Sequence, residues 1–337
     1  MATTYKSLSA TDVASTKTLL NESIPITGSI VSGTYSEGNI KNYSHQMFQS
    51  VYDYPYLSSS ANHIFDVSFG LSATSVLVGA SPSHVAIEKK INMYNQFAQL
   101  LVGYDATGSI LKFDQDGDLT GGTKHTELYF MAFSRLLVKD EIKKGSFQLS
   151  LGTGSSTTPF SGIKTLYDAG AATEYRVNSP AGEYGLLYSN PGGIGAPVGL
   201  LYYQAGIVAF TASVFDLGSF SGSFPRPAAL SGSTIQQLSD VLRQRIYNIQ
   251  FNNTTELNST IYFCRANHNE FNYSSNPTYL SSSKMVIKNT STDAPVSYIT
   301  TVGLYSADNE LLAVAKLSEP LKKDPTNELT IRVRLDY

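Results

Sequence analysis

Short apolar runs separated by turns rich in glycine, serine and proline are the feature that most constrains the fold. Runs of this length, bounded by turn residues, are typical of β-strands rather than of helices. Residues 147–227 contain four of them: Phe147–Leu151, Gly185–Tyr188, Val198–Tyr203 and Ile207–Val214. No period of 20–50 residues recurs, so we expect no repeat array.

The last forty residues carry a clear strand pattern. Within Leu329–Leu335, apolar residues alternate with polar ones, which predicts a half-buried terminal strand. Upstream, Tyr298–Tyr305 and Glu310–Leu317 flank the polar turn Ser306–Asn309, which predicts a hairpin. The C-terminal region is therefore expected to be rich in β-structure.

Three stretches show the spacing of amphipathic helices. Ser83–Val102 has apolar residues three and four apart, with Ser81 or Ser83 as a cap and Gly103 as a stop. Glu127–Leu137 is the second stretch. The third begins at a cap on Ser233, and its apolar stripe runs on to Ile249. The predicted fold class is α+β, predominantly antiparallel β with three amphipathic helices.

Composition shifts divide the sequence into consecutive regions. Residues 1–23 lack a periodic pattern and are expected to form an extended N-terminal arm. A mixed α/β region is expected over 24–146 and a glycine- and serine-rich β region over 147–232. A helix followed by β-structure is expected over 233–337.

The surface of this chain is poor in formal charge. Only 15% of its residues are charged, where a quarter is usual, and it has 22 Tyr, 16 Phe and no Trp. Tyrosine-rich, lysine-poor surfaces are typical of protein–protein interfaces, so we expect extensive contact with other proteins, with a secreted or β-rich monomer as the alternative. The candidate interface residues are Tyr43, Phe48, Tyr52, Tyr54, Tyr56, Tyr305 and Tyr337. For the first five of them, an ordinary position in the core is an equally good interpretation.

Charge and hydropathy argue against two kinds of partner. The net charge is −3 without a basic stripe, so no nucleic-acid partner is expected. Gly199–Val214 is too short and too interrupted for a membrane span. Cys264 is the single cysteine, which excludes an intramolecular disulfide, and we expect it to be a small buried apolar residue.

One carboxylate cluster has the spacing of a metal loop. Asp114, Asp116 and Asp118 alternate along the chain, and calcium prefers several oxygen ligands. The glycine, however, is at the fourth position of the loop, and His125 occupies the twelfth, where an EF-hand has Glu. A polar β-turn is the preferred interpretation, with a calcium loop as the alternative.

Motifs for catalysis are missing from the sequence. Neither a phosphate loop, a His-Glu-X-X-His zinc motif nor a Gly-X-Ser-X-Gly elbow occurs. We therefore expect a protein that is not an enzyme, with no catalytic residue and no cofactor. A glycosidase needs only two carboxylates, which can lie far apart in sequence, so that class stays as a third alternative.

Two segments carry a family resemblance. Asn39–Asp66, with NIKNYSHQMFQSVYDYPYLSSSANHIFD, looks like a stretch of predicted virion structural proteins of large marine tailed phages. Ile299–Tyr337, with VGLY and then LLAVAKL, is similar to the hairpin of phage tail-fibre and tail-collar proteins. Together the two segments cover about a fifth of the chain.

This resemblance implies a structural subunit of a tailed-bacteriophage particle, assembled in the host cytoplasm. Because no shaft-like pattern follows the hairpin, a tail, baseplate or neck component is favoured over a fibre. Its partners would be copies of itself and neighbouring tail or baseplate proteins. The alternatives are a host-surface or carbohydrate-binding module and, third, a virion-associated polysaccharide hydrolase.

Overall fold

The protein was analysed as a computed structural model. It describes residues 5–27, 38–53, 62–79, 84–215, 226–273, 280–281, 284–285 and 295–337. The chain forms two compact units. The larger unit is Leu20–Thr255, and the terminal unit combines Met1–Leu19 with Glu256–Tyr337. The two units differ from the four consecutive regions that the sequence suggested, because pairing between distant strands brings the two ends of the chain into one unit.

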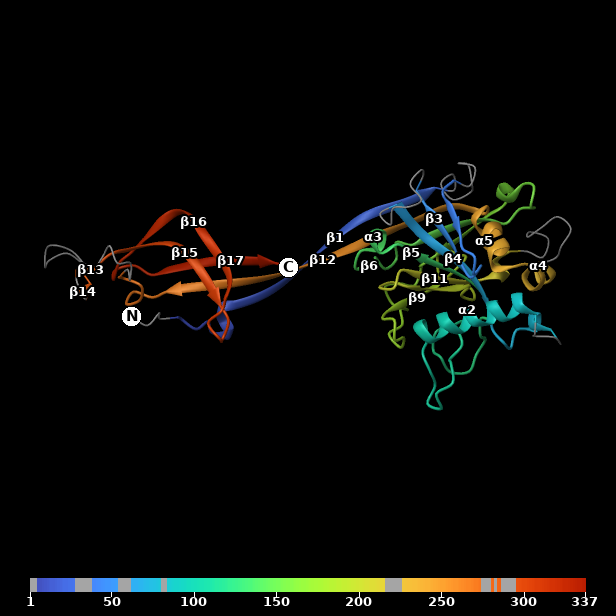
Figure 1. Cartoon of the computed structure of the whole chain (residues 1–337), viewed down its shortest axis with the longest axis horizontal. Helices are drawn as coiled ribbons and strands as arrows, with labels where there is room; N and C mark the ends of the chain where they lie inside the picture. The colour runs from blue at the N-terminus through green and yellow to red at the C-terminus, as the bar shows by residue number, and fades with distance from the viewer. Residues whose placement is uncertain are drawn as a thin grey trace. The chain divides into compact units, whose positions relative to one another are not determined.

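A seven-stranded sheet is the centre of the larger unit (Figure 1). Its strand order is β2-β3-β4-β5-β11-β10-β9, and all neighbours are antiparallel. The strands are β2 (Ile40–Asn42), β3 (Gln49–Tyr52), β4 (His63–Leu71), β5 (Glu127–Phe133), β9 (Tyr184–Leu187), β10 (Gly199–Tyr202) and β11 (Ile207–Thr211).

The long strand β12 (Ile246–Ala266) organises the second sheet. Its first half pairs with β7 (Gln148–Gly152) and β6 (Glu141–Ile142), and β7 pairs in turn with β8 (Ile163–Tyr167). Its second half pairs with β17 (Leu329–Asp336) of the terminal unit. Strand β1 (Val13–Thr27) also pairs with β12, so residues 13–23 of the predicted N-terminal arm are extended and belong to a sheet.

The central strands of the seven-stranded sheet are buried on both faces. In β5, Leu128 and Phe130 face one core, whereas Tyr129, Met131 and Phe133 face the other. The first core lies under α2 (Val85–Leu101) and the loop that follows it. The second lies between this sheet, the strands β7 and β12, and the helix α5 (Ile235–Arg243). Side chains alternate between two apolar layers, which is how a central strand can be apolar at every position.

That double burial explains one wrong prediction. Glu127–Leu137 is not a helix, because its first seven residues form β5 and only α3 (Arg135–Val138) is helical. The continuous run Leu128–Phe133 has no period-2 signal, since both faces of the strand are covered. Without that signal, the apolar residues at helical spacing led to the prediction of a helix instead of a strand.

The other two predicted helices are present. Helix α2 (Val85–Leu101) matches the first, although its N-cap is His84, and Ser81 and Ser83 lie outside the described residues. Helix α5 (Ile235–Arg243) begins after Thr234, whose side chain accepts a hydrogen bond from the Gln237 N–H. It ends nine residues later, and the predicted stripe residues Ile246 and Ile249 belong to β12 instead.

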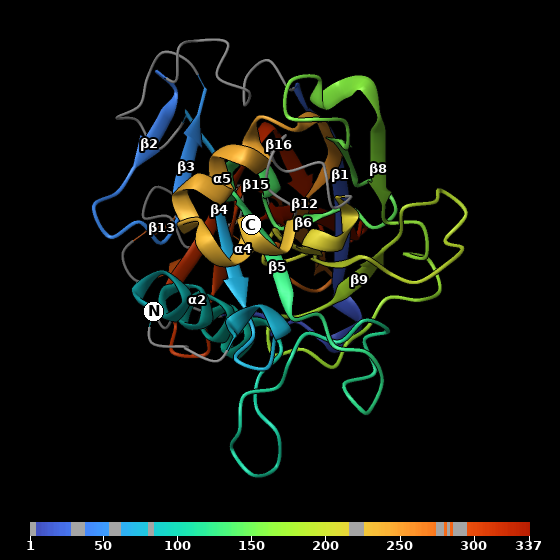
Figure 2. The same cartoon turned by 90° about the vertical axis from the view of Figure 1, so that its right-hand side faces the viewer.

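Helix α4 (Arg226–Gly232), which is labelled in Figure 2, was not predicted. A buried lysine joins it to α2. Lys90 is fully buried, and its Nζ donates to the carbonyl oxygens of Leu230 at 2.6 Å and Ser231 at 3.1 Å. Burial lowers the pKa of Lys90 to about 8. The two carbonyls at the end of α4 thus hold the ammonium in an otherwise apolar place.

The terminal unit contains the predicted hairpin and terminal strand. The hairpin strands are β15 (Ser297–Tyr305) and β16 (Leu311–Lys323), which are antiparallel. Short pieces complete the described structure: η1 (Ala10–Asp12), η3 (Val76–Val78), η4 (Pro159–Ser161), η5 (Ala212–Val214), β13 (Leu280–Ser281) and β14 (Lys284–Met285).

Candidate functional site

The terminal unit has very few buried apolar side chains. Among its described residues, only Ile261, Ala266 and Val333 are buried and apolar, and none belongs to either core of the larger unit. Its exposed large apolar side chains are far more numerous: Tyr5, Leu8, Val13, Leu19, Leu257, Phe271, Tyr273, Tyr298, Tyr305, Leu311, Leu312, Val314, Leu321 and Tyr337. A unit of this size needs a larger core to be stable by itself.

The hairpin shows how the core of the terminal unit stays open. Its inward positions, such as Val302, Leu304 and Ala315, are only half-buried. On the other face, Leu312 is 67% exposed and Val314 is 52% exposed. The alternation is that of a sheet with one covered face, yet both faces of this hairpin still present apolar atoms to solvent.

The predicted interface tyrosines of the terminal unit are in this open region. Tyr305 is 44% exposed, and its ring lies 4.8 Å from that of Tyr5. Tyr337 is 76% exposed, while its N–H donates to the carbonyl of Asn258 and its hydroxyl lies 3.0 Å from Thr260 Oγ1. The backbone at Tyr337 is thus fixed by hydrogen bonding, while the aromatic rings of Tyr305 and Tyr337 remain accessible to a partner.

The aromatic candidates of the larger unit differ from one another. Tyr43 and Phe48 are half-buried, with ring centroids 4.7 Å apart. Tyr52 is buried beside His63, so it is a core residue and is not available to a partner. Tyr54 and Tyr56 lie outside the described residues.

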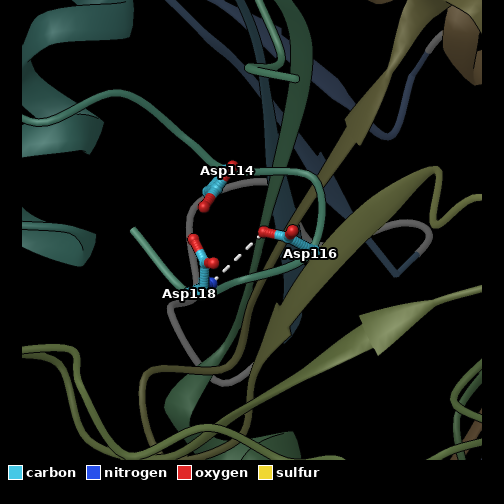
Figure 3. A group of neighbouring side chains, drawn as sticks. All are labelled: Asp114, Asp116 and Asp118. Carbon is cyan, nitrogen blue, oxygen red and sulfur yellow. Dashed lines mark hydrogen bonds between the residues drawn. The ribbon is translucent and has the colours of Figure 1, made fainter. Parts of the chain in front are cut away.

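Asp114, Asp116 and Asp118 do converge, as Figure 3 shows. Each offers a carboxylate oxygen within 4.8 Å of the others. Asp114 is buried, and the ammonium of Lys124 lies 2.8 Å from its Oδ1. Its Oδ2 accepts a hydrogen bond from the Leu119 N–H at 2.8 Å. These three carboxylates could hold a cation, but Lys124 already neutralises the buried one, and the contacts are those of a polar turn.

The buried histidine His125 closes this turn, and one of its ring nitrogens has no hydrogen-bond partner. The His125 N–H donates to Phe113, its carbonyl accepts from the Tyr94 hydroxyl, and its ring Nε2 has no hydrogen-bond partner. Burial lowers the pKa of His125 to about 4 from 6.5. At a pH between about 4 and 6.5, the ring is therefore neutral in the folded protein and protonated in the unfolded chain.

We predict that His125 makes the larger unit sensitive to acid. Between pH 6.5 and 4 the unfolded state binds a proton that the folded state does not, so stability falls as the pH falls. The loss should reach about 3 kcal/mol. In His125→Leu this part of the pH dependence should disappear, as measured by urea unfolding at neutral and acidic pH. An unchanged slope in the variant would contradict the assignment.

Cys264 differs from its predicted environment. It is half-buried in β12 rather than buried, and partial burial raises the pKa of its thiol. Opposite it on β17 is Ile331, one of the half-buried positions of the terminal unit. The partial exposure of Cys264 reflects the open core of the terminal unit.

A pocket in the larger unit was not indicated by any sequence motif. Its volume is about 560 Å³, and it is lined by Lys144, Asp168 and Tyr175 among others. These residues come from the segment before β7 and the loop after β8, which only the folded sheet brings together. No local spacing could have indicated the pocket, because its residues are neighbours only through strand pairing.

Comparison with known proteins provides no family assignment. No protein-family model, no curated protein and no solved structure matches this chain. None of the described helices has the length and apolar character required to cross a membrane.

Proposed function

We propose that this chain is a structural subunit of a tailed-phage particle, in the tail, baseplate or neck, and acts by assembling with copies of itself. The observation that supports self-assembly is the open core of the terminal unit. Its described residues include three buried apolar side chains against a long row of exposed ones. Covering that surface with other copies would supply the missing core.

Other copies of the same chain are the favoured partners for a physical reason. The exposed apolar and aromatic side chains of the terminal unit are of the kind that permanent interfaces bury, and such interfaces resemble a domain core cut in half. Closed symmetric assemblies let one surface be buried in every subunit at once. The phage assignment itself rests on the resemblance of Asn39–Asp66 and Ile299–Tyr337.

The mass of the purified full-length chain in solution tests this proposal. Light scattering should give a whole multiple of 36.5 kDa that persists on dilution, with closed particles in electron micrographs. A stable 36.5 kDa monomer at all concentrations would refute self-assembly. For the phage part, mass spectrometry of purified particles should detect the chain, and its absence from them would refute a virion role.

A further inference from the structure

The pocket of the larger unit has a buried polar end and an aromatic rim. Asp168 is 3% exposed and Phe147 is 1% exposed, whereas Tyr175 and Gln148 are exposed at the opening. The volume of about 560 Å³ lies in the range of small-molecule sites. All of these residues belong to the larger unit, so the pocket does not depend on the terminal unit.

The carboxylate of Asp168 is held in place from two sides. Its Oδ2 accepts the Gly145 N–H at 2.7 Å, and its Oδ1 accepts the Tyr203 hydroxyl at 2.9 Å. A glycine makes room for this pair, since a Cβ at Gly185 would lie 2.1 Å from the Tyr203 hydroxyl and 2.8 Å from Asp168 Oδ1. Each carboxylate oxygen still has a free lone pair with which to accept a hydrogen bond from a ligand.

Lys144 contributes a donor whose charge is already balanced. It forms an ion pair with Glu183, and its ammonium lies 5.1 Å from the ring centre of Tyr175 and 5.3 Å from that of Tyr203. The position over these two rings, which would suit a cationic ligand, is thus taken by the chain's own lysine. An anionic ligand would have to approach the buried Asp168 carboxylate without a spare positive charge.

We propose that this pocket binds a neutral saccharide. Sugar hydroxyls donate and accept at once, so they suit Asp168 as an acceptor, Lys144 as a donor and the Gln148 amide as both. Lys144 covers one face of the Tyr175 ring, but the side chain is still 39% exposed and offers an apolar body with a polar tip to a sugar ring.

The lining also favours binding over hydrolysis. Among the described residues that line the pocket, Asp168 is the only carboxylate, and glycoside hydrolysis needs a pair of them. This inference goes beyond assembly and does not depend on it. The pocket can be tested whether or not the terminal unit associates.

Saturation-transfer NMR on the full-length chain would test the pocket. The probes are methyl glycosides of glucose, galactose, mannose, rhamnose and N-acetylglucosamine, with methyl glucuronide as the anionic comparison. At least one neutral glycoside should bind, and Tyr175→Ala should weaken its binding about tenfold. Asp168→Asn should weaken it at least as much, because the charged acceptor becomes a neutral amide and one of its two oxygens is replaced by an NH₂ group that only donates.

Tyr104→Ala is the matched control, since Tyr104 is 56% exposed on the same unit and does not line the pocket. It should bind like the unmodified chain. Tyr175 is at the rim, so its loss should leave the melting temperature unchanged even where Asp168→Asn lowers it. The proposal is overturned if no neutral glycoside binds, if methyl glucuronide binds better, or if Tyr175→Ala and Tyr104→Ala bind alike.

Discussion

Replacing Leu312 and Val314 together with lysine is expected to separate the assembled chain into single copies. Both side chains are exposed on β16, at 67% and 52%. Burying one such side chain contributes about 1.5–3 kcal/mol, so losing two should weaken association by at least about 100-fold. The two new charges would also have to be buried at the interface, which adds to the loss. Light scattering over a dilution series measures the effect.

The control for this experiment is a pair of apolar residues on the larger unit that are more exposed than the test pair. Val76 is 90% exposed and Ile194 is 74% exposed, so Val76→Lys with Ile194→Lys makes the same chemical change elsewhere. The control should associate like the unmodified chain. If both double variants dissociate equally, or neither does, the interface is not on the terminal hairpin.

Gly70→Val is expected to destabilise the larger unit by about 3 kcal/mol or more, a cost at the upper end for overpacking. Gly70 lies in β4 where helix α2 crosses it, and a Cβ there would lie 2.9 Å from the N, Cα and Cβ atoms of Tyr94. Backbone atoms of a helix cannot yield as a flexible side chain can, so α2 must move. Tyr94 is buried against Phe113, and its hydroxyl donates to the His125 carbonyl, so both contacts would be strained.

Gly232→Ala is the comparison for this variant. Gly232 ends α4, and a Cβ there would meet nothing within 4 Å. Its urea unfolding midpoint should stay at the unmodified value, while that of Gly70→Val falls. Equal stability of Gly70→Val and the unmodified chain would show that the helix is not packed on β4 as described.

Some of the fold was predictable because its signals are local. The strands β7, β9, β10 and β11 each coincide with an apolar run between turn residues. The terminal strand β17 and the hairpin follow from alternation around a polar turn. The convergence of the three aspartates follows from their spacing, since alternate residues of a tight turn can point to one centre.

Other features depended on contacts that no local pattern contains. Strand β5 resembled a helix because a strand covered on both faces loses its alternation. The predicted third helix extended beyond the true end of α5. The first apolar residues of β12 happen to continue the helical spacing of the apolar residues in α5.

The sequence by itself determined a β-rich chain with a small number of helices, because side-chain periodicity and turn residues act over a few neighbours. Only the tertiary structure decided that the chain ends share one unit with an open core, that Gly70 must be small, and that Lys144, Asp168 and Tyr175 share a pocket. These depend on which distant strands pair, and pairing is set by the burial of whole faces rather than by any single segment.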